Sequence, residues 1–221
     1  MVKAVLYDLG DIFFEAHYWR KWMWETLTRI GKYKDDFCTF YNLYEKYLQP
    51  VYENRKEYWG AYKNFLEEMN LKNIDEFEKL SKLQKEFYEK NRVLYRDVEE
   101  TLKKIHDKGI KNIVITDNEN GSEWVRVNIL AKFRVNDLVD LVVTSKETGV
   151  TKPDLKIFQH ALDIYNLKKE EVLFVAHDKD EIDGAVDYGI KTIEFNNYLD
   201  LTNKAVLCME KISDVTSYLG G

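Results

Sequence analysis

The feature that most constrains this chain is a short buried strand that stands far from the other strands of its sheet. Residues 2–7 are mostly apolar and lead directly into Asp8 and Gly10, a pattern typical of a buried strand that ends in a loop. Residues 16–95 then carry aromatic and polar side chains at helical spacing. We therefore expect a discontinuous core domain, residues 1–15 and 96–221, with an all-helical cap domain inserted at residues 16–95.

Helix and strand patterns alternate after residue 95. We expect strands at 112–116, 141–144, 172–175, 192–195 and 205–208, with helices at 98–107, 154–165 and 181–188 and one more at the end of the chain. This alternation predicts an α/β fold with a doubly wound, Rossmann-like parallel sheet. In such sheets, ligands bind at the carboxyl ends of the strands.

The charge and apolar patterns narrow the classes of partner. The net charge is −6, and acidic and basic residues are interspersed without a sustained basic run, so we expect no nucleic-acid partner. Because no apolar run approaches the ~20 residues of a membrane span, we expect a cytoplasmic protein without a membrane partner, either a monomer or a homodimer. Cys38 and Cys208 lie far apart in the sequence, so neither a disulfide framework nor a zinc site is predicted.

Three short patterns fall where predicted strands end or the next helix begins. They are VLYDLGDI, with Asp8 after the first strand; NIVITDN, with Thr116; and TGVTKPDLKIF, with Lys152 before a proline and a helix. Each residue alone has an ordinary structural explanation: a loop aspartate, a strand-end threonine and an exposed lysine at a helix start. The carboxyl ends of parallel strands meet at one edge of the sheet, and there the three side chains would form one site.

Taken together and in this order, the three patterns resemble the haloacid dehalogenase-like (HAD) hydrolase superfamily, in the branch with a helical cap after the first strand. The resemblance covers essentially the whole chain and implies that Asp8 is a covalent nucleophile, while Thr116 and Lys152 hold the transferring phosphoryl group. It further implies a phosphatase of a small phosphorylated metabolite that uses Mg²⁺, with Asp8, the Gly10 carbonyl and Asp178 as ligands.

The first pattern departs from that of the family's phosphatases. These enzymes have a second aspartate two residues after the nucleophile, as acid and base, and this chain has Gly10 there. Asp11 is a substitute candidate, but a shift of one residue in an extended segment would point its side chain to the opposite side. A branch of sugar-phosphate phosphatases reads Asp-x-Gly-Asn, which is similar to DLGDI and favours a phosphatase.

The fourth family pattern is also altered, in the stretch VLFVAHDKDEIDGA. The usual acidic positions are taken by Ala176 and His177, and Asp178 comes one residue late. His177 is a further candidate site residue, either as a ligand of a metal other than Mg²⁺ or as a hydrogen-bonded loop histidine. Asn118, close to Thr116, is another candidate.

Asp180, Glu181 and Asp183 are expected to form a solvated helix start, and one of these acidic groups is a candidate partner of Lys152. The helical segment is rich in aromatic residues. Most of these should form its core, and the rest should line a pocket that faces the strand ends: Trp19, Trp22, Trp24, Tyr41, Tyr44, Tyr52, Tyr58, Trp59 and Tyr62.

Two other functions compete with phosphatase activity. The altered acid–base and metal positions would also suit a catalytically weakened member that binds a phosphorylated ligand without hydrolysing it. A 2-haloacid dehalogenase also uses an aspartate nucleophile and needs no metal, although the aromatic residue that such enzymes carry after the nucleophile is missing here.

Overall fold

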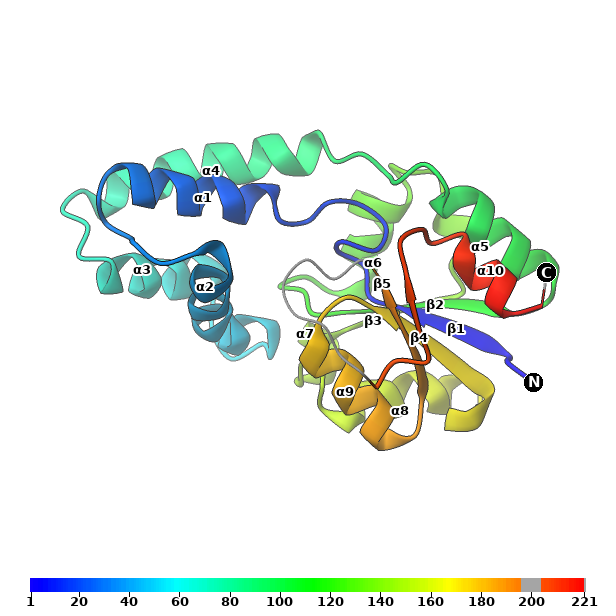
Figure 1. Cartoon of the computed structure of the whole chain (residues 1–221). Coiled ribbons are helices and arrows are strands. Elements are labelled where there is room, and N and C mark those ends of the chain that lie inside the picture. Colours follow the sequence, from blue (N-terminus) through cyan, green and yellow to red (C-terminus); the bar gives the residue numbers. More distant parts are fainter. Residues whose placement is uncertain (196–203, 221) are drawn as a thin grey trace.

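The structure is a computed structural model that describes residues 1–195 and 204–220 (Figure 1). It has a parallel sheet covered by helices on both faces, and a group of four helices that lies beyond one end of the sheet. Both termini lie at the end of the sheet that faces away from these four helices.

The sheet contains six parallel strands in the order β3-β2-β1-β4-β5-β6. They are β1 (Ala4–Tyr7), β2 (Lys111–Thr116), β3 (Leu141–Thr144), β4 (Val172–Ala176), β5 (Lys191–Phe195) and β6 (Leu207–Met209). The strand order reverses at β1, which pairs with both β2 and β4. The predicted doubly wound α/β fold is confirmed, and a ligand site is expected where β1, β2 and β4 end.

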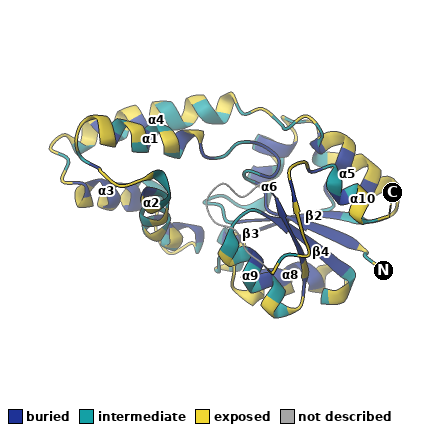
Figure 2. Ribbon diagram, in the orientation of Figure 1, coloured by how far each residue is buried: buried dark blue, intermediate teal, exposed yellow. Residues whose placement is uncertain are grey.

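Apolar runs in the central strands explain why both faces of the sheet are covered (Figure 2). One face packs on α5 (Val98–Asp107), α6 (Ser122–Val125) with the π-helical turn Arg126–Leu130 that continues it, and α10 (Asp214–Tyr218). The other face packs on α8 (Leu155–Ile164) and α9 (Lys179–Tyr188), and the short α7 (Ser145–Thr148) follows β3.

Residues 16–95 are helical as predicted. They form α1 (Tyr18–Arg29), α2 (Phe37–Tyr52), α3 (Tyr58–Glu68) and α4 (Ile74–Lys90), which share an aromatic-rich core of their own. Asp36 and Glu57 cap α2 and α3 by accepting the backbone N–H groups of Thr39 and Gly60. The division of the chain into a core domain and a cap domain remains a prediction.

Most predicted element bounds differ from the observed ones by one or two residues. The first strand begins at Ala4, and the last strand begins at Leu207 instead of residue 205. The helical stretch at 122–130 had no clear periodic signal and was not predicted. Among the described residues, no helix is both long enough and apolar enough to cross a bilayer.

The segment that carries Lys152 is held in place by a close approach between Pro153 and helix α9. A Cβ atom added to Gly184 would lie 2.4 Å from the Cβ atom of Pro153, so only glycine permits this packing. The position of Lys152 therefore depends on a glycine on a different element.

We predict that Gly184→Ala lowers the free energy of unfolding by about 1–3 kcal/mol, because the added methyl group must push the Pro153 segment away. The matched control is Gly60→Ala in α3, where the nearest atom to an added Cβ lies 3.6 Å away. This control should leave stability unchanged or raise it by up to about 1 kcal/mol through helix propensity. Urea unfolding of both variants measures the difference, and equal stabilities would contradict the packing argument.

Candidate active site

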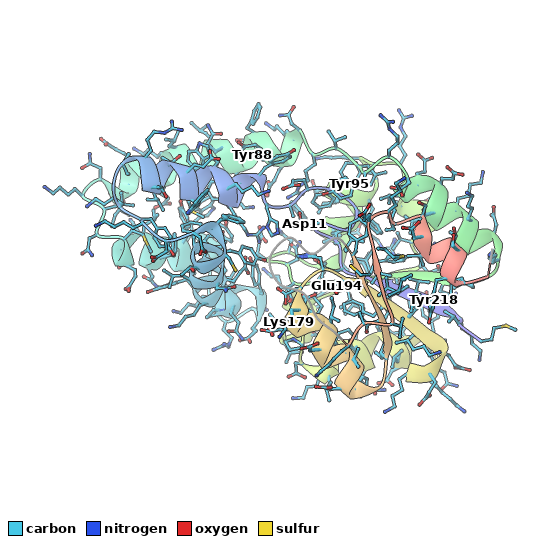
Figure 3. The ribbon with its side chains drawn as sticks, in the orientation of Figure 1. Asp11, Tyr88, Tyr95, Lys179, Glu194 and Tyr218 are labelled. Atoms are coloured by element: carbon cyan, nitrogen blue, oxygen red, sulfur yellow. The ribbon has the colours of Figure 1, made fainter. Side chains whose placement is uncertain are left out.

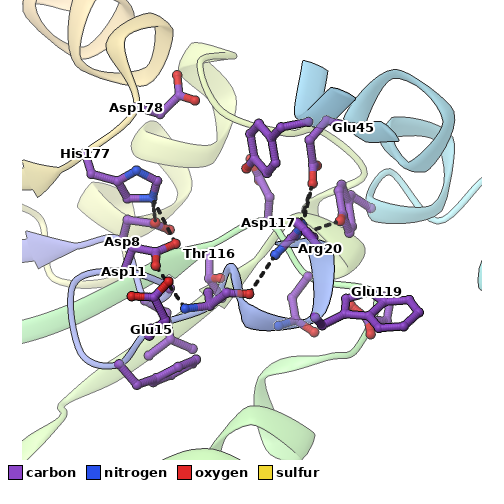
Figure 4. A pocket seen from close by; sticks show the side chains of 18 of the residues that line it. Asp8, Asp11, Glu15, Arg20, Glu45, Thr116, Asp117, Glu119, His177 and Asp178 are labelled. Atoms are coloured by element: carbon purple, nitrogen blue, oxygen red, sulfur yellow. Dashed lines mark hydrogen bonds and ion pairs between the residues drawn. The ribbon is translucent and has the colours of Figure 1, made fainter. Parts of the chain in front are cut away.

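A pocket of about 760 Å³ lies between the ends of β1, β2 and β4 and the helices α1 and α2 (Figure 4). Sequence segments far apart in the chain meet in its wall. Every site residue predicted from the sequence lines this pocket: Asp8, Gly10, Asp11, Thr116, Asn118, Lys152, His177 and Asp178.

Asp8 follows β1 and continues its hydrogen bonding, since its N–H donates to the Val175 carbonyl. Its Oδ1 atom lies 2.5 Å from Lys152 Nζ, and the Lys152 side chain is only 1% exposed. Glu181 Oε2 lies 3.0 Å from the same Nζ atom. Glu181 is thus the acidic partner that was expected for Lys152, and the alternative of an exposed helix-start lysine is excluded.

Charge pairing keeps both members of this contact ionised. Burial by itself would raise the pKa of Asp8, but the charge of Lys152 and the contact with His177 hold it well below its usual range. Burial would lower the pKa of Lys152, but the charges of Asp8 and Glu181 raise it further. Asp8 is therefore a carboxylate at neutral pH, the form that a nucleophile needs.

The end of β2 contributes Thr116, Asp117 and Asn118 to the pocket. Thr116 is the last residue of the strand and is buried. Asp117 Oδ1 accepts the backbone N–H of Lys152 at 3.2 Å, and burial raises the pKa of Asp117 to about 7. Asn118 shapes the loop, because its Oδ1 atom accepts the Asn120 N–H. Asp117 was missed from the sequence, although its place directly after Thr116 was a usable signal.

Asp11 faces the same side as Asp8, so the expectation that it points to the opposite side was wrong. The segment after β1 is a tight turn in which Asp11 has a φ of +58° and donates its N–H to the Phe14 carbonyl. Aspartate tolerates this left-handed conformation better than most residues. Figure 3 shows Asp11 between the sheet and the four helices, and its Oδ2 atom lies 3.9 Å from His177 Nε2.

The same turn explains why position 10 is a glycine. A Cβ atom on Gly10 would lie 2.9 Å from the Cβ atom of Ala16, where the chain folds back. The Ala16 N–H donates to Asp11 Oδ1 at 2.9 Å, which fixes the carboxyl group. This backbone has no room for an aspartate at position 10 and presents Asp11 instead.

Burial gives Asp11 an unusual pKa. It raises the pKa to about 6, although the charge of His177 and the Ala16 N–H act in the opposite direction. Asp11 Oδ2 also lies 3.1 Å from Nε2 of His17, whose pKa burial lowers to about 2. A neutral imidazole nitrogen can donate to a carboxylate or accept from a carboxylic acid. The contact therefore suits both protonation states of Asp11. The sequence carried no signal for His17.

His177 follows β4 and makes a second contact to Asp8, with Nε2 3.4 Å from Asp8 Oδ2. Burial would lower the pKa of His177, but the contact with Asp8 and the charge of Asp8 raise it. Asp178 has a different role in the backbone, because its Oδ1 atom accepts the N–H groups of Asp180 and Glu181 at the start of α9. In Figure 4 the His177 ring lies between the Asp178 carboxylate and Asp8.

This arrangement does not fit the expected Mg²⁺ site. Both oxygens of Asp8 already contact nitrogen atoms, one from Lys152 and one from His177, and Asp178 caps a helix. Mg²⁺ requires hard oxygen ligands in a nearly octahedral shell, whereas the group nearest to Asp8 Oδ2 is an imidazole. Within residues 1–195 and 204–220, no set of three or more histidine, cysteine, aspartate or glutamate side chains is arranged to hold an ion.

The four helices supply the opposite wall of the pocket. Arg20 of α1 donates from Nε to Glu45 of α2 at 3.1 Å, and its guanidinium lies 5.5 Å from the centre of the Tyr41 ring. As predicted, most of the aromatic residues pack in the helical core, but core and pocket residues overlap. The pocket is lined by Trp19, Tyr41, Tyr44, Tyr52 and Tyr58. The Arg20–Glu45 pair was missed from the sequence.

Comparison with known proteins places this chain among hydrolases. A family model described as haloacid dehalogenase-like hydrolase matches residues 24–195. The glyceraldehyde 3-phosphate phosphatase of Pyrococcus furiosus is 32% identical over 96 residues, which cover 43% of this chain and 39% of that protein. The chain thus matches about two fifths of the length of this phosphatase.

Dehalogenases are also among the similar proteins. (S)-2-haloacid dehalogenase 1 of a Pseudomonas species is 26% identical over 196 residues, which cover 86% of this chain and 74% of that protein. The L-2-haloacid dehalogenase structure from Xanthobacter autotrophicus superimposes with a TM-score of 0.73 at 14% identity, covering 100% of this chain and 99% of that chain. At this identity the superposition shows a shared fold.

We predict that Lys152→Met lowers the free energy of unfolding at neutral pH by about 3–5 kcal/mol, because it leaves buried carboxylates without their cation. Lys104→Met is the control: its partner Glu100 is exposed, so the change should stay within about 0.5 kcal/mol. Urea unfolding measures both. The double variant Asp8→Asn/Lys152→Met should lose less than the sum of the single losses, and simple additivity would argue against the coupling.

Proposed function

The chain belongs to the haloacid dehalogenase-like hydrolases, and on that premise we propose that it is a phosphatase of small phosphorylated metabolites. The observation that carries this proposal is the buried carboxyl group of Asp11, which lies on the same side of the turn as Asp8 and has a pKa raised to about 6. Asp11 thus supplies the acid that phosphate-ester cleavage needs, since Gly10 has no carboxyl group.

In the first step, one oxygen of Asp8 attacks the phosphorus atom, and the bond from phosphorus to the leaving oxygen breaks. Lys152 and Thr116 bind the phosphoryl oxygens, and the lysine charge offsets the negative charge of the group in transfer. The leaving oxygen takes the proton of Asp11. The product is an alcohol together with an aspartyl-phosphate on Asp8.

In the second step, Asp11 acts as a base. Its carboxylate removes a proton from a water molecule that attacks phosphorus, the bond to Asp8 breaks, and inorganic phosphate leaves. Asp11 thus alternates between acid and carboxylate in one turnover. The contact to neutral His17 suits this cycle, because Nε2 can serve as donor or acceptor. No step is assigned to a metal ion.

The substrate class follows from the pocket and the relatives. A volume of about 760 Å³ is suited to a small metabolite. The relative from Pyrococcus furiosus is named for a three-carbon sugar phosphate, and one from Halopiger xanaduensis is named for ribulose 1,5-bisphosphate. We extend to this chain only the shared chemistry, a phosphate ester of a small polar alcohol.

Dehalogenation of a 2-haloacid is the second candidate, because the match to a haloacid dehalogenase covers 86% of the chain. The two reactions differ in what the leaving group requires. An alkoxide needs a proton when it departs, whereas a halide ion leaves without one. The placement of the Asp11 carboxyl group beside the nucleophile favours the phosphate ester, because a halide would make no use of that proton.

We predict that the parent protein releases phosphate from at least one member of a panel of small sugar and alkyl phosphates, and that Asp8→Asn reduces this to the level of the blank. The amide cannot form the acyl-phosphate. Asp137→Asn, on an exposed surface, is the control and should retain full activity. Phosphate is measured in chelator and, in parallel, with added divalent ions.

Chloride release from 2-chloropropionate without phosphate release from any ester would favour the dehalogenase. Ligand-induced thermal stabilisation without turnover of either substrate would favour a binding protein.

We predict that Asp11→Asn lowers kcat/KM for alkyl phosphates by ~10²–10⁴-fold but lowers kcat/KM for p-nitrophenyl phosphate far less, because kcat/KM reports the first step and nitrophenolate leaves without a proton. The raised pKa gives the sign of the pH dependence: Asp11 must be protonated in the first step, so alkyl-phosphate kcat/KM should fall as pH rises above about 6. Asp11→Asn should lack this fall. Equal losses for both substrates would show that Asp11 is not the acid.

A further inference from the structure

His177 occupies the position next to the nucleophile where a cation would be expected. It comes directly after β4, and its ring is mostly buried, with 12% of the side chain exposed. Nε2 lies 3.4 Å from Asp8 Oδ2 and 3.9 Å from Asp11 Oδ2, so a single nitrogen faces two carboxyl groups (Figure 4). A nitrogen in this position is a hydrogen-bond donor.

The surroundings of Asp8 are rich in carboxyl groups, and burial raises the pKa values of three of them. Asp11, Asp117 and Glu181 are all buried near Asp8, and Lys152 is the lysine that contacts it. The arrival of a phosphate group adds further negative charge. Lys152 is shared between Asp8 and Glu181, so a second donor group beside Asp8 would help to bind the added negative charge.

The backbone favours an imidazole in this place over a metal ion. Asp178, the acidic ligand expected from the sequence, accepts two backbone N–H groups at the start of α9. Its carboxylate lies on the far side of the His177 ring from Asp8 in Figure 4. The side chain that contacts Asp8 Oδ2 is therefore that of His177, which directly follows β4.

We propose that the Nε2–H group of His177 takes the place of a divalent cation at Asp8, so that phosphate-ester hydrolysis at this site proceeds without a bound metal ion. The proposal rests on the proposed phosphatase function. His177 donates to Asp8 in the resting site and to the phosphoryl oxygens once the nucleophile has attacked. The donor is therefore already in position when negative charge develops on the phosphoryl oxygens during the transfer.

The first test compares phosphate release by the parent protein after dialysis against a chelator and after addition of Mg²⁺, Mn²⁺ or Zn²⁺. We expect turnover to persist in chelator. Any added ion should change the turnover rate by less than about tenfold, which is a smaller effect than removal of one preorganised charge would cause. His177→Asn should lower kcat by ~10²–10³-fold. His160→Asn is the matched control on an exposed helix position and should leave turnover unchanged.

The second test is independent of activity. Calorimetric titration of the parent protein with MgCl₂ should show no saturable binding, whereas His177→Asp, which places a carboxylate at the strand end, should bind Mg²⁺ and become dependent on it for turnover. Saturable Mg²⁺ binding by the parent overturns the proposal, and so does Asp8-dependent turnover that disappears in chelator. In both cases the phosphatase function stands. If no Asp8-dependent phosphate release occurs under any condition, the phosphatase function fails, and this proposal fails with it.

Discussion

The site depends on one buried ion cluster, in which Lys152 lies between Asp8 and Glu181. These three residues come from the end of β1, the segment before α8 and the first turn of α9. A charge buried without a partner is costly, so the three segments can pack only in a register that brings the charges together. Gly184 allows the close approach of α9 that this register requires. The cluster therefore orients the Asp8 carboxylate and links elements that are distant in the sequence.

The pKa values around this cluster separate two carboxyl groups that lie close in space. Asp8 is held ionised by Lys152 and His177, whereas burial keeps Asp11 protonated to about pH 6. A nucleophile and an acid can thus coexist in one pocket, because one carboxyl group has a close cation and the other mainly has low-dielectric surroundings. The two histidines differ in which of these carboxyl groups they contact: neutral His17 contacts Asp11, whereas His177 lies close to both Asp8 and Asp11.

The helices α1 to α4 complete the pocket but do not carry the nucleophile. Their aromatic core is separate from the two core clusters that cover the sheet. Tyr41 and the Arg20–Glu45 pair face the strand ends. Residues in such a wall can change, and the substrate with them, while the ion cluster stays intact. This separation of roles accounts for the mixture of phosphatases and dehalogenases among the similar proteins, since a shared fold does not fix the substrate.

The sequence by itself determined the fold and placed Asp8 at the end of the first strand, while its role as nucleophile stays a prediction. Three features were sufficient: the apolar runs, the long separation between the first strand and the other strands, and the alternation of helices and strands after residue 95. The spacing of apolar residues is a local property of the chain. Asp8, Thr116 and Lys152 were predicted from the resemblance of three short patterns to the haloacid dehalogenase-like superfamily, and strand ends converge in any parallel sheet. The acidic partner of Lys152 could be narrowed to three residues in one helical turn, and packing selected Glu181.

Only the tertiary structure decided which way Asp11 points and what stands beside Asp8. The left-handed turn at Asp11 exists because the chain folds back on Ala16, a contact that no local pattern encodes. The contacts of His17 and His177 join residues from separate elements, and Asp178 is a helix cap because α9 begins there. Side-chain direction within a loop depends on the whole packed surroundings, and these are absent from the linear sequence.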